Sequence, residues 1–188
     1  MNLNIPNSLT IMRVLLIPIF VLCFYADVSW SNSAAAFIFW LAIVTDFLDG
    51  YLARVLNQFS AFGAFLDPVA DKLIVAVALI MLVDKNPTPY SGIWLSLAAI
   101  IIIGREIMIS ALREWMSGIG AKNNIAVSII GKVKTTAQMA ALLLLIYAEP
   151  IMGASSILWG SMFLALSVVL TLWSMIDYVI AAWPKLME

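Results

Sequence analysis

Four aspartates arranged in two pairs are the residues of this sequence best suited to chemistry. Asp46 and Asp49 are three positions apart, and Asp67 and Asp71 are four positions apart. On an α-helix, either spacing puts both carboxylates of a pair on one face. Histidine is absent and Cys23 is the single cysteine, which excludes imidazole bases, cysteine–histidine nucleophiles and thiolate zinc sites. The chemistry has to rest on carboxylates, arginine, lysine and hydroxyl groups.

Both pairs lie in strongly apolar stretches. Of the 188 residues, 64% are hydrophobic and 11% are charged, and the mean hydropathy is +1.05. Soluble domains carry about 25% charged residues, so this composition indicates an integral membrane protein. At about 20 residues per span, the chain holds at most about six helices and no additional soluble domain. We therefore expect one integral-membrane catalytic domain over residues 1–188. A net charge of −1 excludes a basic surface for nucleic acid.

The expected fold class is an all-α membrane protein with six transmembrane helices. Apolar runs separated by polar, glycine and proline clusters predict the spans at residues 8–26, 33–57, 61–83, 91–116, 125–147 and 154–182. With alternating helices, nearly all basic residues fall toward one side, whereas Lys85 falls toward the other. Because basic residues concentrate on the cytoplasmic side, both termini are predicted to be cytoplasmic. The aspartates then lie near the cytoplasmic ends of the second and third spans.

The faces that carry the aspartates also carry small residues. Gly50 and Ala53 continue the face of the first pair, and Gly63 continues that of the second. Small residues let membrane helices approach closely, so we expect them to bring the two acidic faces together. An aspartate at the centre of a membrane helix costs about 2.5–3.5 kcal/mol on the insertion scale, so a cation must lie among the four. Arg54 is the basic residue that shares this stripe.

Oxygen ligands suit hard divalent ions such as Mg²⁺ or Mn²⁺, and a cage of four carboxylates suits two of them. Two other interpretations remain open. The aspartates could pair with arginine and lysine from other spans and serve only to hold the bundle together. Alternatively, they could line a cation or proton pathway, as in a cation-coupled membrane transporter.

The residues around the aspartates resemble a known family. The stretch Asp46-Phe-Leu-Asp49-Gly50-Tyr-Leu-Ala53-Arg54, followed after eight residues by Gly63-Ala-Phe-Leu-Asp67-Pro-Val-Ala-Asp71, is similar to the signature of the CDP-alcohol phosphatidyltransferases. Softer similarity covers nearly the whole chain and includes Asn4 to Thr10 with Arg13, Gly104 to Glu114, and Gly131 to Thr135. These stretches resemble members of the family that use glycerol 3-phosphate as the acceptor.

The resemblance implies an enzyme that transfers the phosphatidyl group of CDP-diacylglycerol to sn-glycerol 3-phosphate, giving phosphatidylglycerophosphate and CMP. It implies that Asp46, Asp49 and Asp67 are metal ligands and that Asp71 shares in the cage and acts as the general base. The residues that it assigns to the nucleotide or the donor headgroup are Gly50, Ala53, Arg54, Gly63, Asn7, Thr10 and Arg13. A bacterial inner-membrane location, an active site that faces the cytoplasm and a homodimer are also implied. Arg54 has a simpler interpretation as an interfacial anchor.

A dianionic acceptor needs a basic pocket, and the available cations are Arg105, Arg113, Lys132 and Lys134. The two arginines are about 80° apart around a helix and can converge, whereas the two lysines point about 200° apart, so at most one of them should face the pocket. The alternative for the lysines is cytoplasmic anchoring. Adjacent helical residues diverge, so Arg105 is not expected to pair with Glu106.

The acceptor depends on the softer similarities. Inositol phosphate, serine and phosphatidylglycerol are alternatives that keep the same chemistry.

Overall fold

Long apolar runs determine the secondary structure of this chain. The computed structural model describes residues 5–56, 60–119 and 129–186, and these residues form six helices and no extended strand. The helices are α1 (Ile5–Tyr25), α2 (Ser31–Val55), α3 (Ala61–Lys85), α4 (Gly92–Gly118), α5 (Ile129–Tyr147) and α6 (Ser156–Leu186). The all-helical prediction is confirmed. Serine side chains begin two helices: Ser60 accepts a hydrogen bond from the Gly63 amide, and Ser91 accepts one from the Ile93 amide.

The predicted boundaries agree with these helices to within a few residues at most ends. The predicted start of the fifth span, at residue 125, lies outside the described residues. The sixth helix ends at Leu186, beyond the predicted end at residue 182. The end of an apolar run marks where the sequence leaves the apolar part of the membrane. The helical backbone hydrogen bonds can continue past that point, so the helix can be longer than the run.

Four of the described helices, α1, α2, α4 and α6, are long and apolar enough to cross a membrane. The other two differ for separate reasons. Helix α3 has 25 residues but carries Asp67, Asp71 and Lys72 in its first half and Asp84 and Lys85 in its last turn. In α5, which has 19 residues, the stretch whose side chains are all described, Val133–Tyr147, is shorter than a full span. Large apolar side chains on the outer surface, such as Phe47, Leu22 and Ile93, are well exposed, as expected for contact with lipid.

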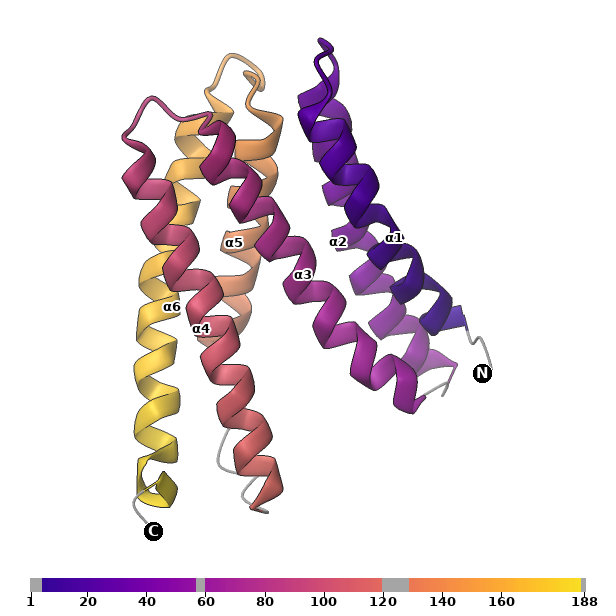
Figure 1. Cartoon of the computed structure of the whole chain (residues 1–188), viewed down its shortest axis with the longest axis vertical. Helices are drawn as coiled ribbons and strands as arrows, with labels where there is room; N and C mark the ends of the chain where they lie inside the picture. The colour runs from indigo at the N-terminus through magenta and orange to yellow at the C-terminus, as the bar shows by residue number, and fades with distance from the viewer. Residues whose placement is uncertain (1–4, 57–59, 120–128, 187–188) are drawn as a thin grey trace.

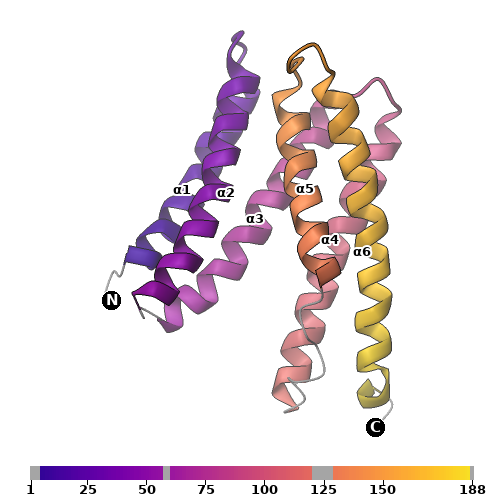
Figure 2. The same cartoon turned by 180° about the vertical axis from the view of Figure 1, so that it is seen from behind.

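The helices run alternately up and down, so the starts of α1, α3 and α5 lie at the same end of the bundle as the ends of α2, α4 and α6 (Figure 1). Helix α1 packs along α2, and α5 packs along α6. Helix α3 runs diagonally from the α1–α2 pair to the group formed by α4, α5 and α6 (Figures 1 and 2). Both described termini therefore lie at one end, which we call the polar end.

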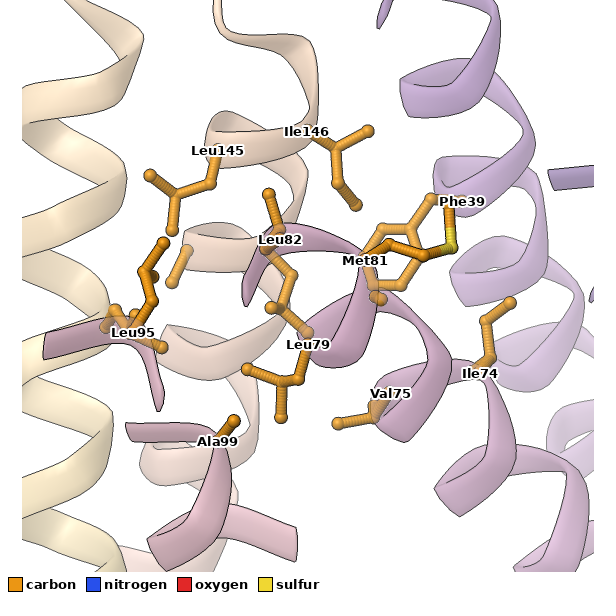
Figure 3. Packing of buried hydrophobic residues seen from close by; sticks show 14 of the residues in the cluster. Phe39, Ile74, Val75, Leu79, Met81, Leu82, Leu95, Ala99, Leu145 and Ile146 are labelled. Carbon is orange, nitrogen blue, oxygen red and sulfur yellow. The ribbon is translucent and has the colours of Figure 1, made fainter. Parts of the chain in front are cut away.

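The hydrophobic core is centred on the second half of α3. Ile74, Val75, Leu79, Met81 and Leu82 are buried, and they lie among Phe39 of α2, Leu95 and Ala99 of α4, and Leu145 and Ile146 of α5 (Figure 3). Helix α3 thus connects both parts of the bundle through apolar packing. Its charged first half extends toward the polar end.

Helices α5 and α6 approach each other closely at Gly160. A Cβ atom added there would lie 2.8 Å from Cγ of Leu145 and 3.2 Å from the carbonyl oxygen of Ala141. Gly104 of α4 differs, since nothing outside its own turn lies within 4 Å of such an atom. The absent side chain at Gly160 therefore permits the packing of two helices.

We predict that Gly160→Ala destabilises the protein by about 1–3 kcal/mol, because the added methyl group overpacks the α5–α6 contact. Gly104→Ala is the matched control and should be neutral or stabilising by up to about 1 kcal/mol, since it raises helix propensity without a clash. Thermal unfolding of the detergent-solubilised variants measures both. Equal midpoints for the two variants would contradict the close approach.

Candidate active site

The four aspartates come together at the polar end, on facing surfaces of α2 and α3. Asp49 is buried, whereas the side chains of Asp46 and Asp71 are 46% and 42% exposed. The spacings of three and four residues therefore do place each pair on one helix face. We call Asp46, Asp49, Asp67 and Asp71 the acidic cluster.

The cation within the acidic cluster is Arg13 of α1. Its side chain is fully buried, and its guanidinium group is paired with Asp46 at 2.9 Å and also with Asp49 and Asp71. Removing one partner of a buried ion pair typically costs about 3–5 kcal/mol, because the remaining charge is left uncompensated. Arg13 is therefore the main counter-charge of the cluster in this structure. Arg54, the basic residue that shares the stripe in the sequence, is not part of these ion pairs; its side chain donates to the Gly50 carbonyl oxygen.

Thr10 completes the connection between α1 and the aspartates. Its hydroxyl donates to Asp67 Oδ1 at 2.6 Å and approaches Asp49 Oδ2 at 3.4 Å. Thr10 and Arg13 are three residues apart and share one face of α1. That face contacts all four aspartates, so α1 forms a third wall of the cluster.

The expected role of the small residues was wrong. A Cβ atom at Gly63 would lie 2.6 Å from Oδ1 of Asn7, so Gly63 admits α1 and not α2. Asn7 is buried and accepts a hydrogen bond from the Ser60 hydroxyl at 2.8 Å. At Gly50, the Arg54 side chain is the one contact within 4 Å of an added Cβ among the described residues outside the backbone of α2. The acidic faces of α2 and α3 therefore meet through α1.

Arg54 and Ala53 lie one turn beyond the acidic cluster, at the end of α2. The Arg54 side chain is exposed, and its Nε donates to the carbonyl oxygen of Gly50 at 2.9 Å. This contact stays within one helix. The structure thus leaves the Arg54 guanidinium group accessible from the polar end.

The donor set of the acidic cluster fits a hard divalent cation, because carboxylate oxygens from two helices already converge on one positive charge. The geometry is nevertheless that of ion pairs with Arg13. Among the described residues, no group of three or more histidine, cysteine or acidic side chains has the arrangement of a metal site.

A cavity of about 710 Å³ opens from the acidic cluster between α2, α3 and α5. Arg13, Asp46 and Asp71 form its polar part. The rest of its wall is largely apolar and includes Trp40 and Ile43 of α2 and Met139, Ala140 and Leu143 of α5. A ligand that is charged at one end and apolar at the other would match both parts.

A second cluster, of cations around Glu106, lies where α4, α5 and α6 meet. Glu106 Oε1 accepts from Lys134 Nζ at 2.7 Å and from Arg105 Nη1 at 2.9 Å. Arg105 and Lys134 are both buried. The expectation that Arg105 cannot pair with its neighbour was wrong, because a long arginine side chain can bend back across the helix surface. The convergence of Arg105 and Lys134 agrees with their predicted grouping, whereas the side chain of Lys132 lies outside the described residues.

Helix α6 supplies two residues to this cluster that the sequence patterns did not reveal. Arg113 Nη2 donates to the Tyr178 hydroxyl at 2.6 Å, and Arg105 Nη2 donates to the Ser174 hydroxyl at 3.3 Å. Their spacing of four does not distinguish them in the sequence, because α6 also carries Ser161, Ser167, Thr171 and Asp177. We call Arg105, Arg113, Lys134, Glu106, Ser174 and Tyr178 the cationic cluster.

The acidic and cationic clusters are neighbours. Lys134 is directed into the cationic cluster, while the next residue, Thr135, lines the cavity together with Asp46 and Asp71. On α3, Lys72 follows Asp71 and donates to the hydroxyl of Ser110 on α4, one turn after Glu106. A small ligand held by the cations can therefore face the cavity that contains the carboxylates.

Comparison with known proteins agrees with this arrangement. The sequence profile described as CDP-alcohol phosphatidyltransferase matches residues 3–173. A protein of Escherichia coli (strain K12), named CDP-diacylglycerol–glycerol-3-phosphate 3-phosphatidyltransferase, is 50% identical over 188 residues, which is 100% of both chains. Proteins of the same name from Shigella sonnei (strain Ss046) and Shigella boydii serotype 4 (strain Sb227) show the same identity and coverage. The chain belongs to the CDP-alcohol phosphatidyltransferase family.

Proposed function

We propose that this chain is a membrane enzyme that transfers the phosphatidyl group of CDP-diacylglycerol to sn-glycerol 3-phosphate, releasing CMP and phosphatidylglycerophosphate. The observation that carries the proposal is a cavity that has both an acidic end and an apolar wall and lies beside a cationic cluster. The full-length relatives named for this reaction support the choice of substrates. A lipid donor and a phosphorylated alcohol need these two environments next to each other.

In this proposal, the donor lies in the cavity, with its acyl chains along the apolar wall and its diphosphate at the acidic end. Arg13 lines the cavity and carries the positive charge that a diphosphate requires. As the family resemblance implies, the nucleotide is contacted by Asn7, Thr10, Gly50, Ala53, Arg54 and Gly63. The exposed guanidinium group of Arg54 is well placed for a phosphate or a ribose near the polar end.

Asp46, Asp49, Asp67 and Asp71 would hold two divalent ions, Mg²⁺ or Mn²⁺. When bound, these ions would neutralise the diphosphate and the departing CMP. The chemistry of the carboxylate set supports this assignment, and the ion pairs with Arg13 show that the cluster already stabilises positive charge.

Asp71 is the proposed general base. Its carboxylate is partly exposed at the cavity wall, where an acceptor hydroxyl can reach it. As the 1-hydroxyl oxygen bonds to the phosphatidyl phosphorus, the bond from that phosphorus to CMP breaks, and the hydroxyl proton passes to Asp71. The acceptor phosphate is bound by Arg105, Arg113 and one of the two lysines Lys132 and Lys134, and the contact of Lys134 with Glu106 favours Lys134.

The proposed topology has six spans, with both termini and the active site in the bacterial cytoplasm at the inner membrane. Its support is the common end of the bundle at which both described termini lie (Figure 1), and toward which the halves of α1, α2, α4 and α5 that carry Arg13, Arg54, Arg113 and Lys134 extend. Residues 1–188 form one catalytic membrane domain in this proposal, and two such chains form a homodimer.

The reaction itself gives the first prediction of this proposal. Purified protein with CDP-diacylglycerol and glycerol 3-phosphate should release CMP in the presence of Mg²⁺ or Mn²⁺, and excess EDTA should stop the release. Inositol phosphate, serine and phosphatidylglycerol should be poor acceptors under the same conditions. Faster release with one of them would reassign the acceptor, and no metal-dependent CMP with any alcohol would favour a transporter.

Asp71→Asn should lower the turnover number by about 10²–10⁴-fold, because the amide cannot accept the hydroxyl proton. The matched control is Asp27→Asn, which changes an exposed aspartate in the connection between α1 and α2. CMP release and the thermal midpoint are measured for both. Near-normal turnover of the Asp71 variant would remove its assigned role.

Topology is tested with cysteine labelling after Cys23→Ser removes the native thiol. In intact spheroplasts, a membrane-impermeant maleimide should label Pro87→Cys, in the connection between α3 and α4, and should not label Glu188→Cys. Permeabilised cells should show labelling of both positions. Labelling of position 188 in intact spheroplasts would reverse the orientation.

A further inference from the structure

Helix α6 contributes two residues without an assigned role to the cationic cluster. Ser174 and Tyr178 are four residues apart, so both point in one direction from the helix. Both contact arginines of α4, through the hydroxyls described above. The family resemblance assigns no role to either residue.

The ring of Tyr178 brings two like charges together. The guanidinium carbons of Arg113 and Arg105 lie 5.0 Å and 5.5 Å from the centre of this one ring. The face of an aromatic ring attracts a cation, which offsets the repulsion between the two guanidinium groups. Tyr178 therefore holds a pair of arginines that would otherwise separate.

The hydrogen bonds orient the same pair. Each α6 hydroxyl accepts from a single terminal nitrogen, Nη2 of Arg113 or Nη2 of Arg105. A guanidinium group has five N–H donors in a rigid plane. Arg113 uses one of them in its contact with α6, and Arg105 uses one with α6 and one with Glu106, so each arginine keeps donors for a ligand. Arg113 is exposed, and an exposed arginine has substantial rotamer entropy to lose on binding. Its contacts with Tyr178 restrict that freedom before a ligand arrives.

The charge of the cationic cluster indicates its ligand. Arg105, Arg113 and Lys134 are positive, and the Glu106 carboxylate that joins two of them is negative. The remaining two positive charges match a phosphate monoester dianion. A phosphodiester or an uncharged alcohol would leave the cluster with excess positive charge.

We propose that Tyr178, assisted by Ser174, is a positioning residue that holds Arg105 and Arg113 as a preorganised fork for the phosphate of the acceptor. This inference rests on the proposed function and extends it to the specificity for a phosphorylated alcohol. Tyr178 acts through the arginines, so its effect is on acceptor binding, whereas the donor and the acidic cluster are untouched.

Three substitutions separate the contributions of the ring and the hydroxyls. Tyr178→Leu removes both the ring and the hydroxyl and should raise KM for glycerol 3-phosphate by about tenfold or more. Tyr178→Phe keeps the ring and should raise it by roughly two- to fivefold, and Ser174→Ala by about twofold. KM for CDP-diacylglycerol should change by less than about twofold in all three, because the donor site is unchanged.

Glycerol provides a second readout, because it lacks the phosphate. The ratio of kcat/KM for glycerol 3-phosphate to kcat/KM for glycerol should fall in Tyr178→Leu by about the same factor as KM rises. Trp173→Leu is the matched control, since Trp173 is 60% exposed on the adjacent face of α6. It should change neither KM nor this ratio.

The possible results distinguish the inference from the function. A wild-type enzyme that uses glycerol 3-phosphate, with Tyr178 variants that keep the wild-type KM or lose activity equally on both acceptors, would overturn the positioning role. If Tyr178→Leu does not yield folded protein, Tyr178→Phe decides the question, and an unchanged acceptor KM there would overturn the role of the hydroxyl. A wild-type protein without CMP release would instead refute the proposed function.

Discussion

Charge placed inside an apolar bundle has to be compensated locally, and the pairing of Arg13 with three aspartates is the interaction on which the polar end depends. The guanidinium group is fully buried, and its partners come from two other helices. Thr10, on the same face of α1, donates a hydrogen bond to the fourth aspartate, Asp67. One face of α1 therefore determines how α2 and α3 approach each other. Without that face, the acidic cluster would be a source of repulsion between the two helices.

The division of α3 into a charged half and an apolar half explains how a small bundle can contain a reaction centre. Leu79 and Leu82 connect α3 to the other helices through close packing, which fixes its position without polar contacts. Asp67 and Asp71 lie in the other half, where α3 faces α1 and the cavity. The apolar packing that stabilises the bundle is therefore mainly at one end, and the side chains that could take part in a reaction lie at the other.

The acidic cluster could be predicted because its signal is local. Spacings of three and four place Asp46 and Asp49 on one helix face, and Asp67 and Asp71 on another, whatever the rest of the fold. Burying these carboxylates is costly, so a cation must lie near them. The position of Arg13 could not be predicted in the same way, because the register of α1 against α2 and α3 is a property of tertiary packing. The contact of Gly63 with Asn7 was missed for the same reason.

The cationic cluster was predicted in composition but not in contacts. Arg105, Arg113 and Lys134 were found from charge, whereas the pairing of Arg105 with Glu106 depends on side-chain conformation, which periodicity does not describe. Tyr178 lies in a helix rich in aromatic and apolar residues, where a tyrosine has no distinctive pattern. Only the placement of α6 against α4 shows what its hydroxyl contacts.

The position of Arg13 in the first helix also bears on how the protein is made. Synthesis proceeds from the N-terminus, so the counter-charge on α1 is made before any of its acidic partners. Asp46 and Asp49 then arrive on the very next helix, which packs along α1, and Asp67 and Asp71 follow on the third. The three carboxylates that pair with Arg13 therefore join a chain that already contains their shared counter-charge.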